Sequence, residues 1–487
     1  MNPIEITRGA DRLRKPEVAG FVLLASLLTA WVIARWGLPA TLALVAVPLI
    51  IIVVGTVFAN PRIGLVTVYI LNFFAIGIYR YIPMIPWGLT VDIFLALTYL
   101  GLFFRMFHRK VEWSAAANGL MVAAALWFGF SLLELLNPEA GSRVAWFFAV
   151  RGISLYMLLT IPLVFVLFSK PSDLRLFLLL WGIFSILGSL KGMQQKFIGP
   201  DPFEQRWLDQ GGAAQHVLFG ELRVFSFFSD AGQFGAAQGM AGVVFGILAL
   251  GEKHRKRKLF YVTVALLGLY GMMISGTRGA LSVPFAGVFL YMVLRKNMKV
   301  LMAGFAVLVA VYFFFNYTYI GQGNSSIRRM RTAFNPEDAS LQTRLTNQQL
   351  IKGYLASRPL GGGLGSTGSV GQKYNPGSFL SSVPTDSWYV MIWMEKGIVG
   401  LTFHLLILFY ILGVTSYRVM FRIRSENVKT PVMAMAAGMF GVMVASYGNP
   451  VLGQMPVGIL LYSSMAFMFM AGRFDREEAA AGIELRK

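Results

Sequence analysis

Long apolar runs alternate with short polar segments along almost the whole chain. Each run approaches the ~20 residues that a helix needs to cross a bilayer, and the breaks between runs are rich in Arg and Lys. Because some runs are short or broken, the pattern predicts about 12 to 14 membrane-spanning helices. The predicted spans are Val18–Trp36, Leu38–Ala59, Ile63–Tyr79, Leu89–Phe107, Leu120–Leu136, Ala145–Phe168, Leu174–Phe197, Phe234–Leu250, Leu259–Ile274, Ala280–Leu294, Val300–Tyr317, Ile398–Tyr417, Val432–Tyr447 and Val451–Ala471.

One long polar segment, Tyr319 to Asp386, interrupts this pattern. It is too polar to cross a bilayer and too long for a tight connection. Its second half is rich in glycine and is expected to coil over a surface. Its first half has five apolar residues that fall mostly on one face of a helix: Leu341, Leu345, Leu350, Ile351 and Leu355. We therefore expect an all-α polytopic membrane protein, a single domain over residues 1–487, with one partly helical loop at 319–386.

Composition agrees with this class. Hydrophobic residues make up 56% of the chain and charged residues 14%, against about a quarter charged in soluble domains. The chain has no cysteine, which excludes disulfides and thiolate chemistry, and its four histidines have no metal-ligand spacing, so neither a metal nor a cofactor is expected. In a soluble protein the net charge of +20 would suggest binding to nucleic acid. Here it indicates basic loops on the cytoplasmic side, and attraction to lipid phosphate is a second explanation for the charge.

The basic residues orient the predicted spans. Most cluster in alternate breaks, and these breaks fall on one side, which is cytoplasmic by the positive-inside rule: Arg8–Lys15, Arg105–Lys110, Lys170–Arg175, Lys253–Lys258, Arg295–Lys299, Arg418–Arg424 and Arg473–Arg476. Both termini are then inside, and the Ile198–Leu222 and 319–386 loops are outside.

Three arginines run against this rule because they lie in outer segments: Arg223, Arg278 and Arg344. A guanidinium can bind a diphosphate through two parallel hydrogen bonds, so one hypothesis is that the three gather round such a group. The alternative for each is a side chain that snorkels to the interface or interacts with a helix end.

The outer segments also carry candidate carboxylates. Asp386 precedes a helical run and either caps that helix or takes a proton from a hydroxyl. Asp230 either lines a cavity or caps the following helix, and Glu395 is interpreted as half of an ion pair with Lys396 on a surface helix. His216 is expected to be solvated.

The glycines at 363, 365 and 368 match the dinucleotide-binding pattern G-x-G-x-x-G. No strand precedes them and no βαβ unit surrounds them, so that function is rejected. We expect these glycines to supply positive φ and close backbone approach, with an anion-binding nest of N–H groups as an alternative.

Four stretches, in this order, resemble the O-antigen ligase and polymerase superfamily of membrane glycosyltransferases. RVFSFFSDAGQFGA resembles its arginine-led outer segment, and SGTRGALSVPFAGVFL resembles its S-x-T-R-[GS]-A signature. SRPLGGGLGST is similar to its glycine-rich loop element, and DSWYVMIWMEKGIVGL to its re-entry into the membrane. The resemblance covers roughly residues 223–400.

The resemblance implies a GT-C-like helical fold that acts on an undecaprenyl-diphosphate-linked glycan at the periplasmic face of the bacterial inner membrane. It implies an inverting transfer in which Arg223 and Arg278 bind the diphosphate. The family's histidine aligns with Asp386 here, a departure that favours a repeat-unit polymerase for exopolysaccharide or O-antigen. Membrane lipid, a flippase and a chain-length regulator are the implied partners.

Three other functions stay open from the sequence, one of them a non-catalytic scaffold of a polysaccharide assembly complex. A ligase that attaches glycan to lipid A–core shares the family resemblance. A lipid-linked glycan transporter would also span the membrane many times, but transporters tend to have paired repeats and a site at mid-membrane. The polar residues of this chain gather instead at the outer edge.

We predict that reporter fusions after Gly365 will report an outside location and fusions after Lys256 an inside one, because the charge rule places these residues on opposite sides. Activity of paired alkaline phosphatase and fluorescent protein fusions measures this. The reverse result at either residue would contradict the orientation.

Overall fold

The computed structural model describes residues 15–218, 220–323, 325–331 and 339–484. Thirteen of the described helices are long and apolar enough to cross a membrane, which confirms the all-α polytopic class. Arg8, Arg12 and Arg14 of the basic leader lie outside the described residues. The spans lie in α2 (Pro16–Ala59), α3 (Pro61–Tyr79), α4 (Gly88–Met106), α5 with η2 (Gly119–Leu136), α6, η3 and α7 (Arg143–Leu167), α8 (Pro171–Phe197), α11 (Ala231–Gly251), α12 (Arg255–Ile274), η5 with α13 (Arg278–Arg295), α14 (Met298–Tyr317), α19 (Trp388–Phe421), α20 (Glu426–Ala445) and α21 (Val457–Glu484).

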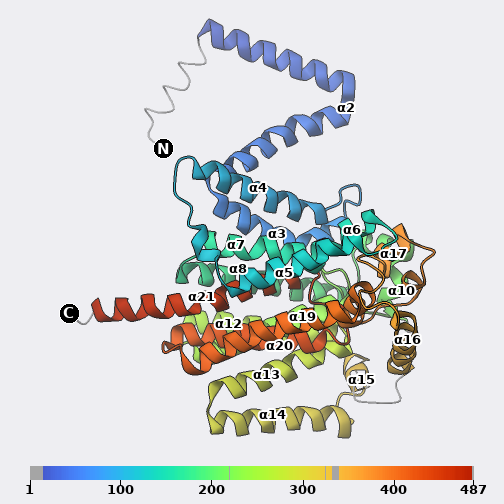
Figure 1. Ribbon diagram of the computed structural model, residues 1–487. Coiled ribbons are helices and arrows are strands. Elements are labelled where there is room, and N and C mark those ends of the chain that lie inside the picture. The colour runs from blue at the N-terminus through green and yellow to red at the C-terminus, as the bar shows by residue number, and fades with distance from the viewer. Residues whose placement is uncertain (1–14, 219, 324, 332–338, 485–487) are drawn as a thin grey trace.

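Burial separates a central group of spans from peripheral ones. Most of α11, α20 and α21 is buried, whereas the first half of α2 has none of its apolar window buried and extends away from the bundle (Figure 1). Gly37, with φ of 61°, breaks α2 into two segments. The exposed apolar surface of α2 and α14 is what a span facing lipid requires.

Small residues let the central helices pack closely. A Cβ built on Gly268 of α12 would lie 2.8 Å from the carbonyl oxygen of Gln238 on α11. A Cβ on Gly287 of α13 would lie 2.9 Å from the carbonyl oxygen of Ala437 on α20. Because lipid supplies no hydrophobic drive between helices, such backbone contacts are a main source of helix association in membranes.

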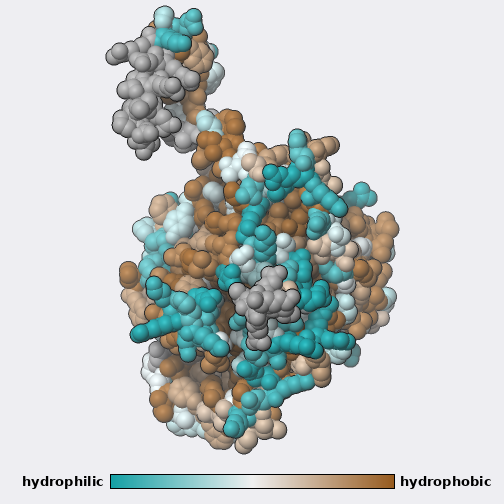
Figure 2. Space-filling model, turned by 90° about the vertical axis from the view of Figure 1, so that its left-hand side faces the viewer, coloured by the Kyte–Doolittle hydropathy of each residue, from teal (hydrophilic) through white to brown (hydrophobic). Residues whose placement is uncertain are grey.

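The basic breaks meet at one end of the bundle. There Arg295, at the end of α13, lies 2.5 Å from Glu426 at the start of α20, and Lys296 donates to the carbonyl of Met420 at 3.2 Å. Arg473 of α21 donates to the carbonyl of Ser169, which follows α7. Figure 2 faces this end and shows hydrophilic side chains gathered across it between hydrophobic flanks.

Short elements occupy the opposite end. Between α8 and α11 these are α9 (Pro202–Trp207), the π-helical turn η4 (Leu208–Gly212), α10 (Ala213–His216) and the antiparallel strands β1 (Val217–Leu218) and β2 (Glu221–Leu222). The 319–386 loop contributes α15 (Ser325–Arg331), α16 (Ala339–Leu355), α17 (Gly368–Tyr374) and α18 (Phe379–Ser382). The labels α10, α15, α16 and α17 lie together opposite the C-terminus in Figure 1.

The predicted helix in the loop is present as α16, but its apolar residues do not share one environment. Ile351 and Leu355 are buried against Leu380, Val383 and Met394. Leu345 and Leu350 are exposed. The helix therefore packs through Ile351 and Leu355 and leaves Leu345 and Leu350 at the surface.

The glycine-rich stretch enters a break in α19. Gly397 there has φ of 64° and ψ of −171°, which interrupts the helix. The N–H of Val399 donates to the carbonyl of Pro359 at 3.3 Å, and the N–H of Gly362 donates to the carbonyl of Met394 at 2.8 Å. Gly361, Gly363 and Gly365 all have positive φ. The expected positive φ is confirmed at Gly363, Gly365 and Gly368, and the expected close backbone approach is confirmed at Gly363 and Gly365.

The interpretation of Glu395 and Lys396 as a surface ion pair is wrong, because both side chains are buried. Lys396 Nζ donates to Ser131 Oγ at 2.5 Å and lies 3.5 Å from the centre of the Trp127 ring. Glu395 Oε1 accepts from the Thr367 hydroxyl at 2.6 Å. The break at Gly397 turns these residues inward, which the sequence did not reveal.

The hydrogen bond from Thr367 to Glu395 joins the glycine-rich stretch to α19.

We predict that Gly397→Ala will lower the free energy of unfolding by about 2 kcal/mol or more, because a side chain at positive φ is strained. A Cβ there would also lie 1.9 Å from the carbonyl oxygen of Pro359. The measurement is the thermal unfolding of the detergent-purified protein.

Gly413→Ala is the matched control. Gly413 lies in the same helix, and a Cβ built on it would have no neighbouring atom within 4 Å. Ala should leave stability unchanged or raise it by up to about 1 kcal/mol. Equal behaviour of the two variants would contradict the docking of the glycine-rich stretch.

Candidate active site

The arginine-led outer segment follows the small β1–β2 hairpin. The N–H of Arg223 donates to the carbonyl of His216 at 2.7 Å, which continues the pairing of the two strands by one residue. The Arg223 guanidinium donates to the Thr277 hydroxyl at 3.2 Å, and this hydroxyl donates to the carbonyl of Ala231 at 2.9 Å. Thr277 therefore joins the Arg223 segment to the segment that begins η5 with Arg278.

The electrostatic surroundings of Arg223 show which predicted residues come together. Burial lowers the pKa of Arg223; Asp230 and Asp386 act to raise it, and Arg278 and Arg344 act to lower it further. Interactions of this kind act over a few ångströms inside a protein. The structure thus brings the three candidate arginines and two candidate carboxylates to one place, from segments as distant in sequence as 223 and 386.

Arg344 and Asp386 are in direct contact. Arg344 Nε donates to Asp386 Oδ2 at 3.3 Å, and both side chains remain partly exposed. Arg344 is also close to the turn after α20, because a Cβ built on Gly448 would lie 3.8 Å from Arg344 Nη1 and 3.8 Å from Gly279 Cα. Arg344 therefore lies between Asp386 and the turn after α20, and that turn lies beside η5.

The alternative that Asp386 caps α19 is wrong. The capping side chain is Ser387, whose hydroxyl oxygen accepts from the N–H of Val390 at 3.4 Å. The N–H of Trp388, the first residue of α19, donates to the carbonyl of Ser446 at 3.0 Å. With the helix end satisfied by its neighbours, the Asp386 carboxylate faces Arg344 instead.

Asp230 does cap a helix. Its carboxylate accepts from the N–H of Gln233 at 2.9 Å at the start of α11, and from the Ser229 hydroxyl at 2.8 Å. The Gln233 amide in turn donates to the carbonyl of Pro450 at 3.0 Å and to Gln454 Oε1 at 2.9 Å. Asp230 is thus held in place while it still acts on Arg223.

Glu395, the remaining candidate carboxylate, is engaged by Thr367 beneath the glycine-rich stretch. It is not among the groups that act on Arg223. The structure therefore places it with the scaffold of the loop, beside the break in α19.

A groove open to solvent lies beside Arg344 and Asp386. It runs between α16 and the start of α19. Apolar side chains, two amides and an aromatic ring line it together with the ion pair: Leu341, Leu345, Asn347, Gln348, Ile351, Pro384, Ser387, Val390 and Tyr447. Such a mixture of apolar surface and amides suits a molecule that carries many hydroxyl groups.

Asn449 also lies at the candidate site, although it was not among the residues predicted from the sequence. A Cβ built on Gly279 would lie 2.2 Å from Asn449 Nδ2, and one built on Gly232 would lie 3.2 Å from Asn449 Oδ1. Within the described residues, Nδ2 is buried without a hydrogen-bond partner. In the sequence, Asn449-Pro450 between two apolar runs has the form of a turn, so no signal marked it.

The expectation that His216 is solvated is also wrong. His216 is buried, with its ring 5.0 Å from the rings of both Trp207 and Phe225. Its Nδ1 lies 3.0 Å from the carbonyl oxygen of Gly212. Burial lowers the pKa of His216. This residue therefore belongs to the packing that supports the Arg223 segment.

Comparison with known families matches residues 263–405 to the family model of O-antigen ligase. The matched range contains Arg278, Arg344, Asp386 and Glu395, whereas Arg223 and Asp230 lie before it. This match confirms the resemblance to the O-antigen ligase and polymerase superfamily. No curated protein matches the chain.

Proposed function

Because residues 263–405 match the O-antigen ligase family, we propose that the protein is a membrane glycosyltransferase that polymerises glycan repeat units carried on a polyprenyl diphosphate. The observation that supports this most directly is the convergence of Arg223, Arg278 and Arg344 beside Asp386. The proposal places the reaction at the end of the bundle opposite the basic breaks, in the periplasm.

In this proposal the arginines bind the donor diphosphate. Guanidinium groups match the oxygens of a phosphate in pairs and keep their charge at any physiological pH. As the bond between the anomeric carbon and the phosphate oxygen breaks, its electron pair leaves with the diphosphate. Positively charged groups already in place stabilise that developing negative charge more in the transition state than in the ground state.

Asp386 acts on the acceptor. A sugar hydroxyl attacks the anomeric carbon from the face opposite the diphosphate, which inverts the configuration, and its proton passes to the Asp386 carboxylate. The groove between α16 and α19 would hold the acceptor sugar, with Asn347 and Gln348 available for its hydroxyl groups. Arg344 contacts Asp386, so in this proposal Arg344 would contact both the donor diphosphate and the base.

The choice of polymerase over ligase follows from the residue at 386. Members of the family that use lipid A–core as acceptor are associated with a histidine at the position that aligns with Asp386. An in vitro test offers the purified protein lipid-linked repeat units in liposomes, with and without lipid A–core. Chains of several repeats formed without lipid A–core support the proposal; transfer to lipid A–core alone would make the protein a ligase.

We predict that Arg278→Lys will lower the rate of polymer formation at least tenfold, because lysine keeps the charge but loses the paired hydrogen bonds. Arg278→Ala should lower the rate further. Polymer length and amount from purified lipid-linked repeat units measure this. Arg328→Lys is the control, because Arg328 is an exposed arginine of the same outer loop on α15. Normal polymer from Arg278→Ala at normal protein level would contradict the assignment.

We predict that Asp386→Asn will lower turnover by ~10²-fold, because Asn cannot accept the proton. Its stability should stay within ~0.5 kcal/mol of wild type, because an exposed ion pair contributes little and Ser387 holds the helix end. The control is Glu139→Gln, which removes an outer ion pair to Arg358 with N–O distance 3.0 Å. Equal rates for wild type and Asp386→Asn would remove Asp386 from the chemistry.

A further inference from the structure

The segment from Arg223 to Asp230 has almost no regular structure of its own. It leaves β2 at Leu222 and reaches α11 at Ala231. Within it, Ser226 is fully buried and has φ of 53°, a left-handed conformation that is unfavourable for residues other than glycine. Such a conformation persists where the surroundings fix it, so the contacts of Ser226 show what holds the segment.

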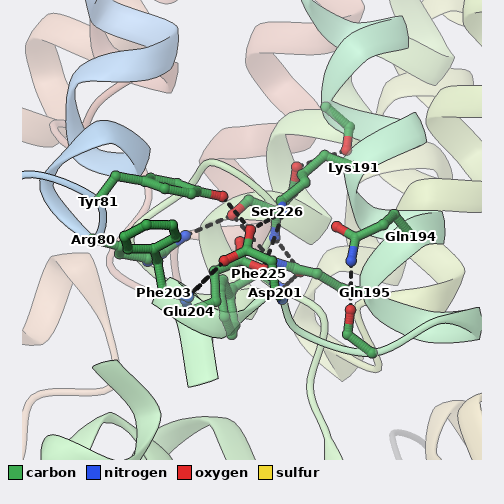
Figure 3. A network of polar contacts seen from close by, with 12 residues as sticks. Arg80, Tyr81, Lys191, Gln194, Gln195, Asp201, Phe203, Glu204, Phe225 and Ser226 are labelled. Carbon is green, nitrogen blue, oxygen red and sulfur yellow. Dashed lines mark hydrogen bonds and ion pairs between the residues drawn. The ribbon is translucent and has the colours of Figure 1, made fainter. Parts of the chain in front are cut away.

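Gln195, near the end of α8, holds the segment from one side. Its side-chain oxygen accepts from the N–H of Ser226 at 2.8 Å and from the N–H of Phe225 at 3.2 Å. Its side-chain nitrogen donates to Glu204 Oε1 at 2.8 Å. Figure 3 shows this amide between Glu204 and the backbone of the segment. One buried side chain thus satisfies two consecutive backbone N–H groups that no strand or helix pairs.

Arg80, directly after α3, holds the same segment from the other side. Its guanidinium donates to the carbonyl of Ser226 at 2.6 Å (Figure 3). It also donates to the carbonyl of Phe228. It also lies 4.2 Å from the centre of the Phe225 ring and 4.8 Å from that of Trp207. A guanidinium is suited to two carbonyls and two ring faces because it is planar and carries several donors.

Glu204, which orients Gln195, is itself fixed. It accepts from Lys191 at 3.1 Å, and Asp201 accepts from the same Lys191 at 2.8 Å. The N–H of Asp201 donates to the second oxygen of Glu204 at 3.1 Å. The network therefore runs from two spans, α3 and α8, through α9 to the backbone of the arginine-led segment.

We infer that Gln195 and Arg80 are positioning residues that set where Arg223 lies in the active site. Arg223 precedes Phe225 by two residues in extended chain, so a shift of the backbone at 225–226 carries directly to Arg223. A displacement of about 1 Å is enough to spoil a bound geometry. The inference rests on the proposed role of Arg223 in binding the donor diphosphate.

The decisive experiment is a double-mutant cycle between Gln195 and Arg223. Gln195→Met keeps the length of the side chain and removes its polar atoms. Rates of polymer formation are measured against the concentration of lipid-linked donor for Gln195→Met, Arg223→Ala and the double variant. Gln194→Met is the matched control, because Gln194 is the preceding residue of α8 and donates to the carbonyl of Gly199 at 2.5 Å instead.

A positioning role predicts a rise of at least tenfold in the donor KM for Gln195→Met and less than a twofold change for Gln194→Met. It also predicts that Gln195→Met adds less than twofold to the defect of Arg223→Ala, because Gln195 acts through Arg223. A purely structural role would lower the unfolding temperature and multiply the two defects, which would overturn the inference.

Two results separate this inference from the proposed function. If Arg223→Ala impairs donor binding while Gln195→Met does not, the inference fails and the proposed function stands. If Arg223→Ala has no effect, both fail. Should Gln195→Met not fold, Arg80→Lys replaces it, because lysine keeps the charge but loses the planar fork that reaches both carbonyls and stacks on both rings. The same cycle with Arg223→Ala then applies with the same outcomes.

Discussion

The need to satisfy every backbone hydrogen bond without water is the constraint on which this structure depends. In hydrocarbon an unpaired N–H or C=O costs several kcal/mol, so the chain crosses as helix. The irregular backbone gathers where side chains or other backbone can satisfy it: at Gly397, where the carbonyl of Pro359 meets the broken helix, and at Phe225–Ser226, where Gln195 does so.

The two ends of the bundle use charge differently. At the basic end, arginines such as Arg295 and Arg473 join helix ends to one another through Glu426 and the carbonyl of Ser169. At the opposite end, arginines come from three separate segments and lie together beside Asp386. Like charges held together in a partly buried place are costly, and Asp230 and Asp386 offset part of that cost. In the proposed function the donor diphosphate would offset more of it.

Residues of the membrane-spanning helices hold this site in place. The position of Arg223 depends on side chains from α3 and α8 that make no contact with a substrate in the proposed reaction. Glu395 plays a comparable part for the glycine-rich stretch, which it holds through Thr367. If the proposed function holds, this arrangement fixes the phosphate-binding groups on the membrane domain and leaves the acceptor side open.

The amino-acid sequence by itself determined the class and the approximate spans, and it marked the three arginines as exceptions to the charge rule. These follow from hydrophobic length and from the charge asymmetry of the breaks, which are local properties of the chain. Arg80 also follows a predicted span at the outer end, so it too is an exception to the positive-inside rule. It was not singled out from the sequence. The tertiary structure decided the rest. Ser387 and not Asp386 caps α19, Glu395 and Lys396 turn inward at Gly397, and His216 is buried. Asn449 lies beside Gly232 and Gly279, which are distant in sequence. Each of these outcomes depends on which backbone group lies opposite a side chain in the folded protein. Neither the periodicity nor the composition of the chain shows which groups will face each other in the folded protein.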